Sequence, residues 1–118
     1  MMYSGSVSSY SIQIFPSNWE GPFGYTRVVG LQVALSGGGG SGLALLAFVP
    51  NGRPVPDSST RAGTTNPVVF DLFVPMDDYT AIVDLVRNEK PINFVFEDTS
   101  LEMGVTTYGE SVGEDQGK

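Results

Sequence analysis

The chain contains neither cysteine nor histidine in its 118 residues. Without cysteine it has no disulfide framework, thiol nucleophile or thiolate metal ligand. Without histidine it lacks the commonest general base near neutral pH and the commonest metal-binding ring. A serine nucleophile would depend on Lys90 or Lys118 as its base, and Lys118 is the final residue. The sequence therefore favours a non-enzymatic protein with no cofactor and no bound metal.

Long apolar runs and clusters of basic residues are also missing. No window approaches the roughly 20 apolar residues of a membrane-spanning helix, and residues 1–9 lack the charged and then apolar pattern of a secretory signal. We therefore expect no membrane partner and a cytoplasmic location. The net charge is −7, and affinity for nucleic acids comes from clustered lysine and arginine. We expect no nucleic-acid partner.

The best-defined pattern is a strand, a helix and a second strand between Val68 and Asp98. Residues 68–74 and 92–97 alternate as strands do, and both runs carry apolar side chains on both faces. Between them, apolar residues recur at three- and four-residue spacing from Tyr79, which predicts an amphipathic helix. One helix covers only one face of a sheet, so the other face needs a second sheet or a second subunit.

Alternating apolar residues predict four further strands, over 7–15, 26–35, 43–49 and 101–107. A glycine-rich connection occupies 36–42 and a long, proline-rich polar loop occupies 50–67. We therefore predict a mainly β (α+β) fold: a six-stranded, mostly antiparallel β-barrel or sandwich with one amphipathic helix between strands 4 and 5. Residues 1–108 are expected to form a single β-rich domain, and 109–118 a disordered acidic tail.

Three short motifs resemble functional sites but have simpler structural explanations. The glycines of 36–42 fit the spacing of a dinucleotide site, yet the residues before Pro50 are too few for the helix that would hold the pyrophosphate. Asp98 begins a turn similar to that of aspartic proteases, but Ser100 replaces the glycine, and a second carboxylate is missing. The adjacent acids at 77 and 78 are explained by the electropositive start of the helix.

Two loops hold the candidate binding residues. The loop after the first strand combines aromatic rings with an amide and a carboxylate, which suits a sugar ring or a partner protein's anchor residues. The alternative is that these rings plug an open end of the sheet. The proline-rich loop carries two arginines, which suit an anion or an acidic partner unless the loop is simply solvated. The candidates for ligand or partner binding are Trp19, Glu20, Phe23, Tyr25, Arg53 and Arg61.

These patterns predict a non-enzymatic protein-interaction or structural module. It would self-associate as a homo-oligomer, or dock to another protein, through strand edges and the loop around Trp19. Strands that are apolar on both faces favour this function, because a second copy can cover the exposed face. The alternative is a small-ligand or carbohydrate-binding module that uses the aromatic loop 15–25.

Overall fold

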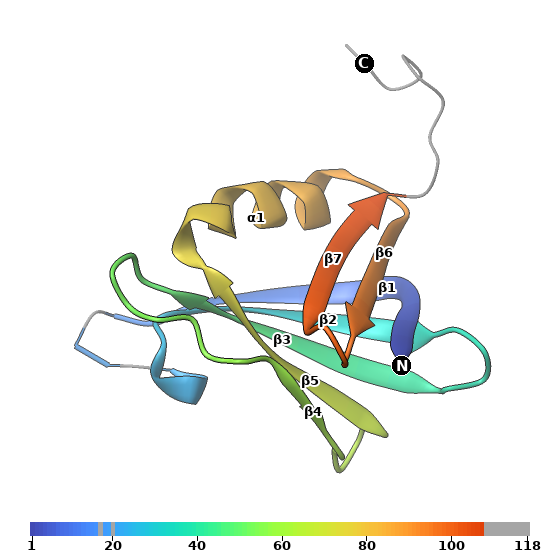
Figure 1. Ribbon diagram of the computed structural model, residues 1–118. Helices are drawn as coiled ribbons and strands as arrows, with labels where there is room; N and C mark the ends of the chain where they lie inside the picture. Colours follow the sequence, from blue (N-terminus) through green and yellow to red (C-terminus); the bar gives the residue numbers. More distant parts are fainter. Residues whose placement is uncertain (17, 20, 108–118) are drawn as a thin grey trace.

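The computed structural model describes residues 1–107 except 17 and 20 (Figure 1). Within this part, seven strands form one sheet in the order β4-β5-β3-β2-β1-β6-β7. One α-helix lies between β5 and β6, and two short 3-10 turns flank other elements. The elements are β1 (Met2–Ile14), η1 (Pro22–Gly24), β2 (Arg27–Leu35), β3 (Ser41–Val49), β4 (Ser59–Arg61), β5 (Val68–Pro75), η2 (Met76–Asp78), α1 (Tyr79–Asn88), β6 (Ile92–Glu97) and β7 (Glu102–Thr107).

The mainly β prediction is confirmed, but the count of six strands is wrong. The strand that was missed is β4, which lies inside the loop predicted over 50–67. Its three residues have no apolar alternation, and they become a strand only because Thr60 pairs with Phe70 of β5. The extra strand also moves α1, which follows the fifth strand in the chain instead of the fourth.

The sheet is mixed because one of its strand pairs is parallel. β3 and β5 run in the same direction, with Leu46 opposite Leu72, while the other five neighbouring pairs are antiparallel. A parallel pair needs a connection that returns the chain to the starting end of the first strand. Residues 50–67 provide that return, which local sequence patterns do not reveal.

The sheet curls into a half-barrel around α1, so the predicted β-barrel or sandwich is correct only in part. α1 lies across the concave face in Figure 1 and buries Val83 and Val86 against it. The predicted helix is therefore confirmed together with the strands on either side of it. The largest fully buried side chains of this inner core are Phe48, Phe70, Phe94, Phe96, Leu31, Leu46 and Leu72.

The outer face of the sheet is covered by loops near the end of β3 and β5. Tyr25 is buried there with Ala47 and Val49. The rings of Phe23 and Tyr25 lie edge-on to Phe73 of β5, with centroids 5.6 and 5.8 Å away. The second covering layer that doubly apolar strands require is therefore supplied here by the chain's own loops. No helix in the described residues is long and apolar enough to cross a membrane.

Candidate functional site

The half of β1 that has a neighbour on one side only is the main candidate for a binding site. β1 pairs with β2 as far as Ile14, but it pairs with β6 only as far as Ser6. The register with β2 shifts between Val7 and Ser9, which marks a bulge where the two halves of β1 meet. Beyond this bulge, no other described strand pairs with β1 on the β6 side. We call Ser9–Phe15 the open segment.

The backbone geometry shows which hydrogen-bonding groups of the open segment face outward. The N–H of Phe15 donates to the carbonyl oxygen of Thr26 at 2.7 Å, so the polar groups of Phe15 face β2. Successive residues of an antiparallel strand alternate in the side to which these groups point. The N–H and C=O groups of Tyr10, Ile12 and Ile14 therefore point away from β2, toward the open edge.

The side chains of the open segment are apolar on one face and uncharged throughout. Tyr10 and Ile14 lie on the inner face of the sheet, yet they are 44% and 63% exposed, with half-buried Ile12 between them. No charged residue lies between Met2 and Trp19. Edge strands of soluble proteins usually carry charges or prolines that discourage pairing with another chain. The open segment carries neither.

The two outer edges of the sheet have protections that the open segment lacks. β4 is only three residues long and ends with Arg61, while β7 begins with exposed Glu102. β1 instead resembles β3, which is paired on both sides, in carrying no charge. β1 and β3 are the two described strands without a charged residue. The open segment therefore lacks charge, as the interior strand β3 does, although it lies at an edge.

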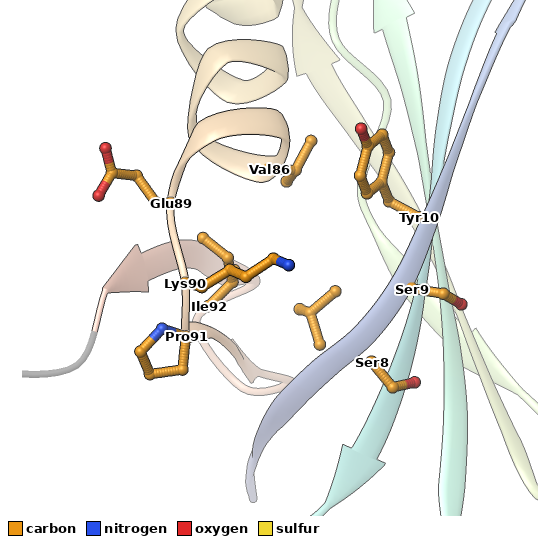
Figure 2. Close-up of a pocket in the computed structure, with 9 residues that line it drawn as sticks. Ser8, Ser9, Tyr10, Val86, Glu89, Lys90, Pro91 and Ile92 are labelled. Carbon is orange, nitrogen blue, oxygen red and sulfur yellow. The ribbon is translucent and has the colours of Figure 1, made fainter.

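A pocket of about 730 Å³ lies beside the open segment, where β1 passes the end of α1 (Figure 2). Tyr10, Val86 and Ile92 form apolar parts of its wall. Figure 2 shows the amine of Lys90 reaching into the space between α1 and β1, while the carboxylate of Glu89 points away. Beyond Tyr10, β1 slants away from α1 in this view. The pocket therefore opens along the unpaired edge, and its size lies within the range of ligand sites.

The aromatic residues predicted as one site divide into two groups. Trp19 is 60% exposed and its ring lies edge-on to Phe15, with centroids 4.8 Å apart. Phe23 and Tyr25 instead pack against the outer face of the sheet, at Phe73. The plug interpretation therefore describes Tyr25, while Trp19 remains open to solvent. Residue 20, which was predicted beside them, lies outside the described residues.

The two predicted arginines already have partners within the chain. The guanidinium of Arg53 lies over the Tyr25 ring, 4.9 Å from the ring centroid, which is within cation–π distance. The Nε of Arg61 donates to Oδ2 of Asp71 at 2.7 Å. Oδ1 of Asp71 is buried and has no hydrogen-bond partner among the described residues. The two arginines are therefore engaged at Tyr25 and at Asp71, and not at Trp19, among the described residues.

The two motifs dismissed on sequence grounds are turns in the structure. Gly37, Gly38 and Gly40 have positive φ in the hairpin turn between β2 and β3, and a strand follows this turn where a dinucleotide site would need a helix. Asp98 lies in the turn between β6 and β7, where its carboxylate accepts a hydrogen bond from the amino group of Met1 at 2.7 Å. Neither turn has the partners that its proposed chemistry requires.

The start of β1 is held to β6 by charge as well as by backbone pairing. Hydrogen bonds from the Thr99 N–H and from the Met1 amino group keep the pKa of Glu97 below its usual range. Hydrogen bonds to Asp98 and Glu97 raise the pKa of the Met1 amino group. Both groups are exposed at the surface. They fix the closed half of β1, and no comparable ion pair is recorded along the open segment.

Other site chemistry is sparse in the part of the chain that the structure describes. It contains no cluster of three or more acidic side chains that would hold a metal ion. Asp77 and Asp78 lie in η2, directly before α1, and Asp78, the N-cap residue of α1, makes no side-chain cap hydrogen bond. The open segment was missed as a site by sequence reasoning, although one signal was visible: a long uncharged run of strand-forming residues at the N-terminus.

The comparisons with known proteins add no family to this description. The chain matches no protein-family model, no curated protein and no solved structure at a significant level.

Proposed function

We propose that this chain is a protein-interaction module that binds an extended strand along the open segment of β1. The observation that carries the proposal is the unequal pairing of β1, whose ladder with β2 reaches Ile14 while its ladder with β6 ends at Ser6. Added strands bind exposed sheet edges through main-chain hydrogen bonds, and side-chain pockets along the edge give specificity. The open segment offers both parts of such a site.

The main-chain part of the site comes from three residues. Tyr10, Ile12 and Ile14 direct their N–H and C=O groups outward, so an added antiparallel strand finds donors and acceptors at alternate positions. The side-chain part comes from the exposed surfaces of Tyr10 and Ile14 and from the pocket wall at Val86. An uncharged strand with apolar residues at alternate positions fits this edge best, because nothing along the edge would pair with a charge.

A peptide titration followed by NMR tests this function. The probe is a synthetic, uncharged seven-residue strand with alternating apolar and serine residues, added to dilute protein. We expect chemical-shift changes and amide protection at Tyr10, Ile12 and Ile14. The control is the same peptide methylated at alternate backbone nitrogens, which removes its donors and should abolish the changes. Changes confined to other strands, or none at all, would refute the proposal.

A second candidate function rests on the exposure of Trp19. Its ring is 60% exposed and packs edge-on against Phe15, so an apolar surface is accessible to a sugar ring. Trp19 is the chain's one tryptophan, so its fluorescence reports directly on this surface. A glycan panel should shift or quench this fluorescence if the loop binds sugars. A Phe23→Ala variant is the matched control, since Phe23 packs on Phe73 and not on Trp19. A flat response across the panel would exclude this function.

A further inference from the structure

We propose that the strand which completes the open segment is the open segment of a second copy of this chain, paired antiparallel about a two-fold axis at Ile12. This inference rests on the proposed function and adds the identity and the register of the partner. The resulting dimer would join two curled sheets into one continuous sheet.

Charge is the first reason for choosing a second copy as the partner. The chain carries a net charge of −7, and residues 68–118 hold eleven of its thirteen acids, so most of its surfaces repel an identical chain. The open segment is uncharged and therefore meets its own copy without like-charge repulsion. A strand that binds a charged partner is expected to carry the opposite charge, and the open segment carries no charge.

The exposed side chains of the open segment are the second reason. A two-fold symmetric interface uses the same surface on both copies, so the surface must be complementary to itself. Tyr10 and Ile14 lie on the same face of β1, four residues apart, and both are exposed. An antiparallel copy centred between them places Tyr10 of each copy opposite Ile14 of the other, which makes two equivalent pairs. Aromatic and β-branched side chains are a favourable cross-strand pair.

The boundaries of the open segment fix the register. The bulge between Val7 and Ser9 limits regular pairing at one end, and Pro16, which has no N–H, limits it at the other. The seven residues between these limits have Ile12 at their centre. Pairing about Ile12 also joins outward-facing groups to outward-facing groups, since Tyr10, Ile12 and Ile14 all point their backbone polar groups to the open edge.

A shift of the axis by one residue gives a poorer match. With the axis at Ser11, Tyr10 would lie opposite Ile12, and Ile14 would lie opposite Ser8 at the bulge. The exposed side chain of Ile14 would then gain no apolar partner. The geometry therefore selects one register. Access is open, because β1 slants away from α1 beyond Tyr10 (Figure 2).

Sedimentation over a range from low micromolar to submillimolar concentration tests whether the dimer forms. We expect a monomer-to-dimer transition for the chain of 12.6 kDa. Ile14→Lys should weaken the dimer about a hundredfold, because symmetry removes two buried isoleucine side chains at once. Val55→Lys is the matched control, since Val55 is similarly exposed, at 45%, but lies in the loop before β4. It should leave the dimer unchanged.

Disulfide formation between introduced cysteines tests the register, and no native cysteine competes with them. Ser11 and Gln13 have exposed side chains on the outer face of β1. In the proposed register Ser11 lies opposite Gln13 of the second copy, within disulfide reach, whereas each residue is diagonal to its own copy. Mixing Ser11→Cys with Gln13→Cys chains in a glutathione buffer should give mostly mixed disulfide dimers. A majority of Ser11→Cys homodimers would overturn the register.

The outcomes separate this inference from the function on which it rests. If the chain stays monomeric at all concentrations while the synthetic strand still binds at Tyr10, Ile12 and Ile14, the second-copy inference fails and the strand-binding function stands. If the synthetic strand does not bind at the open segment, the strand-binding function itself fails. A dimer that Ile14→Lys leaves intact uses another surface, and this result also overturns the inference.

Discussion

The two halves of β1 show how one strand can serve two purposes. The closed half, Met2–Ser6, pairs with β6 along its whole length and with β2 at Gly5 and Ser6, and its Tyr3 ring packs edge-on to Phe70 with centroids 5.1 Å apart. The open half has the same uncharged character, but Tyr10 and Ile14 face solvent. The two halves of β1 therefore share the absence of charge but differ in the burial of their side chains. The open segment is therefore an uncharged strand that has a neighbour on one side only.

The largest expected effect comes from proline placed at two positions of the open half. Ser11 lies opposite Gly30 and directs its N–H toward β2, whereas Ile14 directs its N–H toward the open edge. Ser11→Pro should lower the free energy of unfolding by about 2–4 kcal/mol. The substitution removes a hydrogen bond of the ladder with β2 and leaves the carbonyl acceptor on β2 unpaired. Ile14→Pro should cost less than about 1 kcal/mol, because its N–H has no partner in the monomer. Urea unfolding of dilute samples measures both, and equal losses would contradict the assigned alternation.

A smaller effect separates the two halves by side-chain truncation. Tyr3→Ala removes a half-buried ring from the core around Phe70 and should cost about 2 kcal/mol of unfolding free energy. Tyr10→Ala removes a ring that is largely exposed, so its cost in the monomer should be below about 1 kcal/mol. The same urea experiment compares the pair. If Tyr10→Ala proved as costly as Tyr3→Ala, the open half would be as well packed as the closed half.

Hydrogen exchange sharpens the comparison at single-residue resolution. In dilute protein, the amides of Tyr10, Ile12 and Ile14 should exchange quickly, while those of Ser11 and Gln13 should be protected by β2. Gly5 and Ser6 in the closed half should lack this alternation, because they have strand partners on both sides. NMR-detected exchange reads out each amide. Uniform protection along β1 would show that the edge is already covered.

The smallest expected effect is a pH dependence at the closed half. The pKa of Glu97 is lowered in the folded chain, so the stability that it contributes is present above its ordinary pKa and is lost as pH falls through the lowered value. The pKa of the Met1 amino group is raised, so its contribution is lost as pH rises through that raised value. Stability should therefore fall slightly at both ends of the pH range. Glu97→Gln should flatten the acidic side in thermal unfolding, and an unchanged profile would contradict the ion pair.

Local sequence patterns were sufficient for most individual elements. The spacing of apolar residues predicted α1 and β6 closely, because a helix face and a strand face have distinct periods of 3.6 and 2 residues. The same patterns failed where tertiary contacts decide the structure. β4 has no pattern of its own, and the first five residues of β1 are mostly small and polar, so each becomes a strand only through its neighbours.

The candidate site was harder to predict than the fold. The sequence placed Trp19 in an aromatic loop and made it a candidate binding residue. It could not show that Tyr25 packs against Phe73 while Trp19 stays exposed. The open segment was predicted as a strand with one solvated face, and nothing in its sequence shows that one of its edges is open. That property belongs to the relation between β1 and β6, which lie far apart in the chain.

The amino-acid sequence was enough to establish that the chain has no thiol or imidazole groups, and to predict the helix, most of the strands and the uncharged character of β1. These follow from residue types and from short-range periodicity. Only the tertiary structure decided the strand order, the parallel pairing of β3 with β5 and the point at which β1 parts from β6. The physical reason is that strand pairing joins residues distant in sequence, through backbone groups that every residue carries and no residue type encodes.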